Sequence, residues 1–151
     1  MKSILITGGA GFIGSHTCLL LLEKGYIVFI LDSLVNSSEK SIDKVSLILK
    51  QKGLDPEGRI FFIKGNIKNQ KDIERVFQTG IKLNMNIESV IHFAGLKSVF
   101  DSVNNPIDYW ENNVIGTIKL LKVMEKYNCR NFVFSSSATV YKANVSKLLC
   151  E

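Results

Sequence analysis

The stretch that decides the fold is ILITGGAGFIGSH, residues 4–16. Gly8, Gly11 and Gly14 are spaced three residues apart, between a short apolar run and a segment with helical spacing. The first glycine permits a tight turn, the second lets the backbone approach a pyrophosphate, and the third allows helix and strand to pack closely. The free N–H groups and positive dipole end of the following helix attract phosphates. The stretch therefore predicts a dinucleotide-binding turn.

An acidic residue at the end of the second apolar run has the spacing that such a turn requires. Asp32 follows Gly14 by 18 residues. Its carboxylate can accept hydrogen bonds from both hydroxyls of an adenosine ribose, and it would repel the 2′-phosphate of NADP. The pattern therefore predicts NAD as the cofactor. The alternative is that the glycines serve packing alone and that Asp32 is solvated.

The rest of the chain alternates between two kinds of segment. Short apolar runs predict strands over Ser3–Thr7, Ile27–Leu31, Ile60–Ile63, Ser89–Phe93 and Asn131–Ser135. Helical spacing predicts helices over Phe12–Lys24, Ser38–Lys52, Lys71–Gln78 and Pro106–Tyr127. Continuous apolar strands indicate burial on both faces, as in a parallel sheet covered by helices. We predict a doubly wound α/β (Rossmann) fold that is truncated after about the fifth strand.

Local signals set the ends of two helices. Gly25 is placed to end the first helix, and Asn105 to cap the last, with Pro106 in its first turn. One apolar stripe of the last helix is interpreted as core; it consists of Ile107, Trp110, Val114, Ile118 and Leu121.

Composition excludes several classes of protein. With 151 residues, 46% hydrophobic and 22% charged, the chain is expected to form one globular domain. Its net charge of +5 comes from scattered lysines, which argues against a nucleic-acid partner. No apolar run approaches the length of a membrane span, so no membrane partner is expected. Cys18, Cys129 and Cys150 lack metal-ligand spacing, so we expect no metal site, reduced thiols and a cytoplasmic location.

Five motifs together resemble one family. They are TGGAGFIGSH (7–16), LDSLVNSS (31–38), VIHFAGLKSV (90–99), NPIDYWENNVIGT (105–117) and FVFSSSATVY (132–141). In this order they are similar to the amino-terminal half of UDP-glucose 4-epimerases, which are extended short-chain dehydrogenases/reductases. The resemblance runs from Thr7 to Tyr141 and covers nearly the whole chain.

The resemblance implies a set of residues that contact NAD. They are Gly8, Gly11, Phe12, Ile13, Gly14, Asp32, Ser33, Asn36, Asn66, Ile67, Phe93, Ala94, Gly95, Lys97 and Asn112. Asn66 stands where the family usually has Asp, so its bond to the adenine amino group would lack charge and be weaker. For Lys97 the alternative is a solvated loop lysine. His92, inside a strand, is interpreted as a structural residue rather than a general base.

The resemblance also implies an incomplete catalytic site. In the family the base is a Tyr four residues before a Lys, assisted by a Ser from the preceding strand, and Ser137 matches that Ser. No Tyr in this chain has Lys at the fourth following position. Tyr141 matches a structural tyrosine of the family instead. We therefore expect residues 1–151 to be an NAD-binding domain without the substrate domain.

Two functions follow from this reading. One is epimerase chemistry, with a UDP-sugar bound only if a missing half is supplied. The other is a free-standing or vestigial dinucleotide-binding module that acts through a protein partner. We also expect a homo-oligomer, because the last strand leaves an open edge and the family's long helix commonly forms a dimer's helical bundle. Alternatively, the tail Lys142–Glu151 folds back over this edge.

Overall fold

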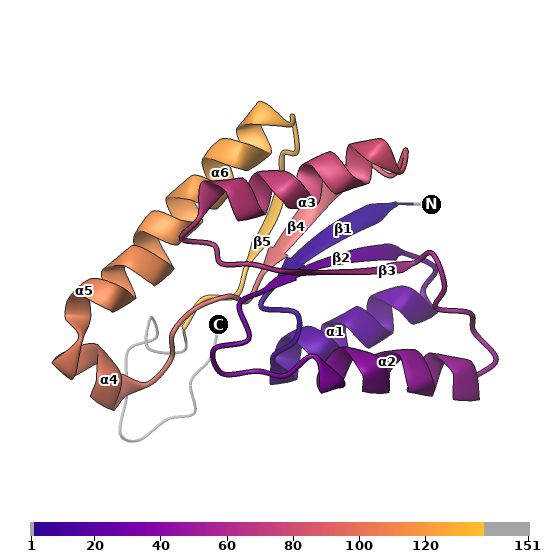
Figure 1. Cartoon of the computed structure of the whole chain (residues 1–151), viewed down its shortest axis with the longest axis horizontal. Helices are drawn as coiled ribbons and strands as arrows, with labels where there is room; N and C mark the ends of the chain where they lie inside the picture. The colour runs from indigo at the N-terminus through magenta and orange to yellow at the C-terminus, as the bar shows by residue number, and fades with distance from the viewer. Residues whose placement is uncertain (1, 138–151) are drawn as a thin grey trace, which may run out of the picture.

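The computed structural model describes residues 2–137. A parallel sheet of five strands forms the centre of this part of the chain (Figure 1). Neighbouring strands pair in the order β3-β2-β1-β4-β5, and all four pairings are parallel. The strands are β1 (Ser3–Thr7), β2 (Ile27–Asp32), β3 (Ile60–Lys64), β4 (Ile87–His92) and β5 (Asn131–Phe134). Every strand lies where the apolar runs predicted it. Tyr141 and the tail Lys142–Glu151 lie outside the described residues.

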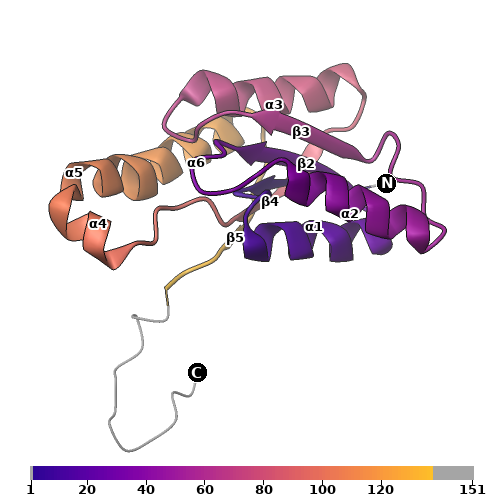
Figure 2. The ribbon, with the colours of Figure 1, turned by 60° about the horizontal axis from the view of Figure 1, so that its bottom comes forward.

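Helices cover both faces of this sheet (Figure 2). α1 (Phe12–Glu23) and α2 (Lys40–Gln51) lie on one face, and α3 (Gln70–Lys82) and α6 (Gly116–Lys126) lie on the other. Along β1, Ile4 and Ile6 pack with α1 and α2, whereas Leu5 packs with α3 and α6. Both faces of the strand are therefore buried, which explains its unbroken apolar sequence. The predicted doubly wound α/β fold is confirmed.

The ends of the first and third helices follow from local chemistry. Gly25 has a φ of 87° and follows the last residues of α1, as predicted. The side chain of Asn69 caps α3 by accepting a hydrogen bond from the backbone N–H of Lys71 at 3.1 Å. α3 ends at Lys82 and is therefore longer than the predicted Lys71–Gln78.

The helical region after β4 differs from its prediction. It begins with a helix that was not predicted, α4 (Val99–Asn104), and continues through α5 (Pro106–Tyr109), the π-helical segment η1 (Trp110–Ile115) and α6. Pro106 occupies the first turn of α5, as expected, but the side chain of Asn105 makes no capping hydrogen bond. The predicted helical span Pro106–Tyr127 is confirmed to within one residue, since α5, η1 and α6 are continuous, but a π-helical segment interrupts it and the predicted capping by the Asn105 side chain was wrong.

The apolar stripe of this region is a surface. Ile107 is 69% exposed and Trp110 63%, and the other predicted stripe residues, Val114, Ile118 and Leu121, are also exposed. The buried face of α6 is a second stripe, made by Gly116, Leu120, Val123 and Met124. The interpretation of the first stripe as core was wrong. Because apolar residues occupy more than one face, their spacing alone does not identify the face that meets the sheet.

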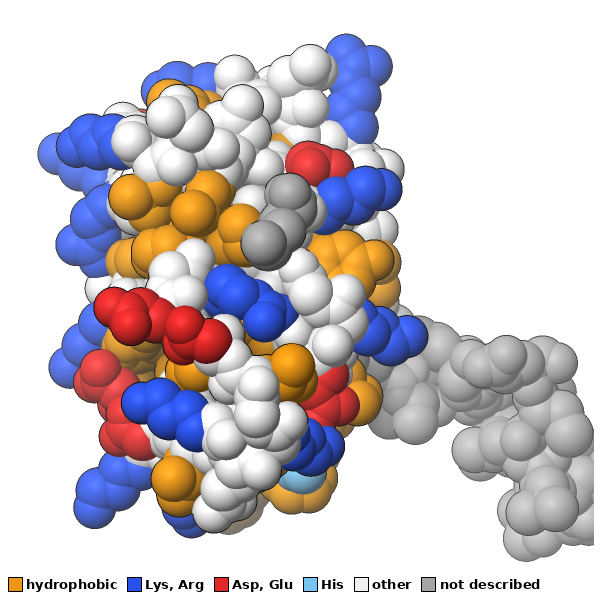
Figure 3. Space-filling model, turned by 90° about the vertical axis from the view of Figure 1, so that its right-hand side faces the viewer, with side chains coloured by type: hydrophobic (Ala, Val, Ile, Leu, Met, Phe, Trp, Pro, Cys, Tyr) orange, Lys and Arg blue, Asp and Glu red, His pale blue; other side chains and the backbone are white. Residues whose placement is uncertain are grey.

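Charged side chains are spread over the molecule. In Figure 3, Lys and Arg side chains are distributed around the visible face, and Asp and Glu side chains lie among them. Four ion pairs join charged side chains of the described residues, and all four lie at least partly in solvent. Among residues 2–137, no helix is both long and apolar enough to cross a membrane.

Candidate nucleotide-binding site

A cleft opens at the carboxyl ends of β1 and β4. The chain leaves β1 for α1 on one face of the sheet, and it leaves β4 for the helices on the other face. In doubly wound sheets, ligands bind in the crevice formed where the connections diverge in this way. The cleft has a volume of about 380 Å³, within the ~300–1,000 Å³ typical of ligand pockets.

All fifteen predicted cofactor residues line this one cleft. They are Gly8, Gly11, Phe12, Ile13, Gly14, Asp32, Ser33, Asn36, Asn66, Ile67, Phe93, Ala94, Gly95, Lys97 and Asn112. They come from five separate segments of the chain. The structure thus brings the set together, while their contact with NAD stays a prediction.

The remaining lining residues were not predicted. They are Leu31, Val35, Gly65, Lys68, Leu96, Asp108 and Ser135. Most adjoin a predicted residue in the sequence, but nothing in the sequence indicated Asp108. Ser137, the predicted catalytic serine, is exposed beyond the end of β5 and is absent from the lining, whereas Ser135 is part of it.

The glycine turn is determined by steric contacts. Gly8 has a φ of +70°, and a Cβ on it would lie 2.7 Å from the backbone nitrogen of Ala94. A Cβ on Gly14 would lie 2.2 Å from the carbonyl oxygen of Gly8. These contacts confirm the turn at Gly8 and the close packing at Gly14. They add a further function for Gly8, because only a residue without a side chain lets the turn touch the loop that follows β4.

The amino terminus of α1 faces the cleft through this turn. α1 begins at Phe12, and no side chain caps it among the described residues. Phe12 is 82% exposed, so its side chain does not cover the backbone N–H groups at the start of the helix. Backbone N–H groups at an uncapped helix start favour a phosphate.

The carboxylate of Asp32 is buried and held by three donors. Its Oδ2 accepts from the backbone N–H of Ala10 at 2.9 Å. Its Oδ1 accepts from the backbone N–H of Leu34 at 2.9 Å and from the Ser37 hydroxyl at 2.8 Å. A carboxylate offers about four acceptor positions, which leaves about one for a ribose hydroxyl. If both ribose hydroxyls donated to Asp32, at least one of them would bond to a carboxylate oxygen whose acceptor positions are already taken by protein donors.

Asn66 is engaged in a local turn. Its Oδ1 accepts a hydrogen bond from the backbone N–H of Lys68 at 2.9 Å. Its own backbone N–H donates to Oδ2 of Asp72, also at 2.9 Å. The amide oxygen that was expected to accept from adenine thus has one lone pair left, since an amide oxygen carries two. The bond from Lys68 therefore weakens any bond to adenine further, in addition to the lack of a carboxylate charge at Asn66.

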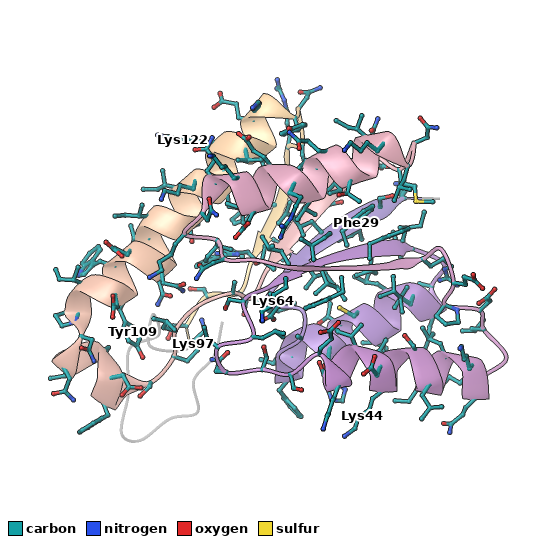
Figure 4. The ribbon with its side chains drawn as sticks, in the orientation of Figure 1. Phe29, Lys44, Lys64, Lys97, Tyr109 and Lys122 are labelled. Atoms are coloured by element: carbon teal, nitrogen blue, oxygen red, sulfur yellow. The ribbon has the colours of Figure 1, made fainter. Side chains whose placement is uncertain are left out.

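The loop between β4 and α4 is fastened to η1 by one side chain. Asn113 Oδ1 accepts from the backbone N–H of Leu96 at 2.8 Å, and Asn113 Nδ2 donates to the Leu96 carbonyl at 3.0 Å. Figure 4 shows Lys97 on this loop, beside the carboxyl ends of the strands. Small residues at Ala94 and Gly95 keep the backbone of the loop accessible in the cleft.

His92 bridges two threonines below the cleft. The Thr117 hydroxyl donates to the backbone carbonyl of Asn113 at 2.7 Å, so it accepts from His92 Nε2–H at 3.0 Å. His92 Nδ1 then accepts from the Thr7 hydroxyl at 2.5 Å. Burial, and then the positive charge of Lys97, lower the pKa of His92 to about 4. A neutral imidazole whose two ring nitrogens are both hydrogen-bonded fits the interpretation of His92 as a structural residue.

The chemistry of the cleft suits an elongated phosphorylated ligand. It offers a helix start for phosphates, a fixed carboxylate for hydroxyls, amide groups, and the cation of Lys97. Among residues 2–137, no group of three or more His, Cys, Asp or Glu side chains is placed to hold a metal ion.

Comparison with known proteins decides the family. The sequence matches the GDP-mannose 4,6 dehydratase family over residues 5–147. The chain belongs to this family. It is 47% identical over 139 residues to a UDP-glucose 4-epimerase of Schizosaccharomyces pombe, covering 92% of this chain and 36% of that protein. It is 50% identical over 139 residues to the UDP-glucose 4-epimerase of Yersinia enterocolitica, covering 92% and 38%.

Solved structures agree with these matches. The UDP-glucose 4-epimerase from Bifidobacterium longum, in complex with NAD+ and UDP, superposes with a TM-score of 0.80 at 43% identity. The match covers 92% of this chain and 38% of that one. The Thermus thermophilus UDP-glucose 4-epimerase complex with NAD gives 0.77 at 28% identity, covering 97% and 42%. The resemblance to UDP-glucose 4-epimerases is confirmed, and the chain spans a little more than a third of the curated relatives' length.

Proposed function

We propose that this chain binds NAD in the cleft, as the cofactor-binding part of a UDP-sugar epimerase. The observation that carries the proposal is the assembly of all fifteen predicted residues around one cleft, next to the uncapped start of α1. Two of the solved relatives described above hold NAD. A cytoplasmic location with reduced thiols is part of the proposal; Cys18 and Cys129 are buried, and burial raises the pKa of Cys18 to about 12.

Each part of the cleft has one task in binding. The backbone of the Gly8–Gly14 turn receives the pyrophosphate, and Asp32 receives the adenosine ribose. Lys97 supplies a cation near the phosphates, and Asn112 an amide for the middle of the cofactor. When bound, NAD supplies a hydride acceptor. The arrangement favours NAD over NADP because a 2′-phosphate would meet the Asp32 carboxylate.

The chain alone is proposed to be catalytically silent. Removing a proton from a sugar hydroxyl requires a base whose pKa lies near the working pH. A serine hydroxyl such as that of Ser137 is a weak base by itself, and the chain contains no Tyr with Lys at the fourth following position. Epimerase chemistry on a UDP-sugar therefore depends on residues supplied by further polypeptide.

The second candidate function is a dinucleotide-binding module that acts through a protein partner. The observation in its favour is the exposed apolar surface of α4, α5 and η1, which includes Phe100, Val103, Ile107 and Trp110. Large exposed apolar patches mark sites of association, and these residues lie on consecutive helical segments. Incubating the purified chain with UDP-galactose and NAD separates the two functions, since only an active epimerase forms UDP-glucose.

NAD binding is tested by titrating the purified chain with NADH in a calorimeter and by following its thermal unfolding. We expect saturable heat and a rise in Tm. Neither heat nor a thermal shift up to millimolar NADH would contradict the proposal.

A further inference from the structure

Asn113 connects two parts of the cleft that come from different elements. Its side chain holds the loop after β4 through two hydrogen bonds to Leu96, one accepted at 2.8 Å and one donated at 3.0 Å. Its Oδ1 also accepts from Asn112 Nδ2 at 2.9 Å. Asn112 and Leu96 both line the cleft, but Asn113 itself does not. One half-buried amide thus fixes both the loop and a neighbouring lining side chain.

This arrangement lies within the π-helical segment. Asn112 and Asn113 are adjacent in the sequence and both lie within η1 (Trp110–Ile115). In a regular α-helix of 3.6 residues per turn, adjacent side chains point about 100° apart. In η1 their amide groups meet at hydrogen-bond distance. Such π segments inside α-helices frequently occur at functional sites.

The backbone of Asn113 is fixed as well. Its carbonyl accepts from the Thr117 hydroxyl at 2.7 Å, and Thr117 in turn accepts from buried His92 of β4. The loop fits tightly around the amide: a Cβ on Gly95 would lie 3.4 Å from Asn113 Oδ1 and 3.2 Å from Lys97 Nζ. The backbone of Asn113 is therefore tied to the sheet through Thr117 and His92, and its side chain holds the loop.

We propose that Asn113 is a positioning residue for the central and nicotinamide part of NAD, an inference that rests on the proposed function. By holding Leu96 and Asn112, it fixes the positions of three groups that would contact this part of the ligand. They are the backbone at Gly95, the cation of Lys97 and the Asn112 amide. The task requires a side chain that accepts two hydrogen bonds and donates one over this short reach. Asn meets this requirement with two separate atoms, Oδ1 and Nδ2. Ala has no polar side-chain atom, and Ser has a single oxygen that lies closer to the backbone, so it cannot make the same set of bonds.

The loop after β4 and the glycine turn lie at different parts of the cleft, so two ligands of different length can tell their contributions apart. AMP carries only the adenine, its ribose and one phosphate, which belong to the Asp32 and Gly11 side of the cleft. NADH extends beyond them to the loop held by Asn113. Loss of Asn113 should therefore weaken NADH binding and leave AMP binding unchanged. A residue that served the fold alone would weaken both.

The experiment measures the dissociation constants of NADH and AMP for the whole chain and three variants. Asn113→Ala is expected to weaken NADH roughly tenfold, as the loss of one or two hydrogen bonds would. Asn113→Ser, a polar substitution, should do the same. Asn104→Ala is the matched control, because Asn104 makes one hydrogen bond, to the Phe100 carbonyl at 3.1 Å, and lies exposed on α4. This control should leave both constants unchanged.

The outcomes separate the two proposals. If the wild-type chain binds NADH and both Asn113 variants bind it equally well, the positioning function is wrong and the proposed NAD binding stands. An equal loss of AMP and NADH binding, or loss of folding in both variants, would make Asn113 structural and also overturn the inference. If the wild-type chain binds no NADH, the proposed function fails and this inference fails with it.

Discussion

The glycine turn and the helical region from α4 to α6 meet at the same cleft, yet they are built on different constraints. In the turn, backbone contacts admit only glycine: a Cβ on Gly14 would lie 2.2 Å from a carbonyl oxygen. In the helical region, large apolar side chains such as Trp110 and Ile107 face solvent. The turn is determined by close backbone contacts, with Gly14 against Gly8 and Gly8 against Ala94, whereas the surface of the helices depends on what else packs against them.

The largest effect is expected at the turn. Gly14→Ala should lower the free energy of unfolding by about 3 kcal/mol or more, because the added methyl group meets backbone that cannot move aside. It should also abolish NADH binding. Gly53→Ala is the control: Gly53 has a φ of +73° but no heavy atom within 4 Å of a Cβ, so only a strain of about 1 kcal/mol is expected. Urea unfolding of both variants gives the comparison, and equal losses would contradict it.

Two adjacent leucines on α6 sharpen the contrast between its faces. Leu120 is 0% exposed and packs in the core under the sheet, whereas Leu121 is 43% exposed. Leu120→Ala should cost about 2–5 kcal/mol of unfolding free energy, the usual range for a buried leucine. Leu121→Ala should cost less than about 1 kcal/mol. Chemical denaturation distinguishes them, and similar values would mean that the exposed face is covered.

Protonation of His92 should destabilise the chain in acid. The pKa of His92 is about 4 in the folded protein and 6.5 as a reference, so the unfolded state takes up its proton first as pH falls. Stability should therefore decrease between pH 6.5 and pH 4, by on the order of 2–3 kcal/mol. In His92→Gln, the part of the pH dependence in this window that arises from His92 should vanish. Unfolding curves of the two proteins that keep the same pH slope would refute this account.

The smallest effect on stability is expected on the exposed stripe. Replacing Ile107 and Trp110 with Ser should change the unfolding free energy by no more than about 0.5 kcal/mol, because neither side chain is buried. If this face joins copies of the chain, as the expected homo-oligomer requires, the double variant should be a monomer. Light scattering that gives a monomer for the wild-type chain at high concentration would exclude the expected oligomer.

The same contrast explains what could be predicted from sequence. Gly8, Gly14 and Asp32 were identified because their functions depend on sterics and charge at a fixed spacing. Asn105 occupies the predicted N-cap position of the last helical span but its side chain makes no capping hydrogen bond, and the sequence did not indicate that the short helix α4 ends immediately before it. Asn113 carried no signal, because its hydrogen bonds to Leu96 join residues 17 positions apart and depend on how η1 meets the loop after β4.

The exposure of the apolar stripe was missed for a different reason. The periodicity of residues 107–121 identifies an apolar face, but a face is buried only if another element covers it. Among residues 2–137, α6 meets the sheet and α3 with the neighbouring face instead. The exposure of the last strand depends on neighbouring elements in the same way. β5 pairs with β4, and Val133 and Phe134 lie exposed within the described part of the chain.

The central claim is that this chain binds NAD through the glycine turn and Asp32. The most direct measurement is a calorimetric titration of NADH into the wild-type chain and into Asp32→Ala. We expect saturable binding by the wild type and loss of most of the affinity in the variant, since the carboxylate both receives the ribose and holds the turn through Ala10. An absence of heat with the wild type, or equal affinity in the variant, would contradict the account.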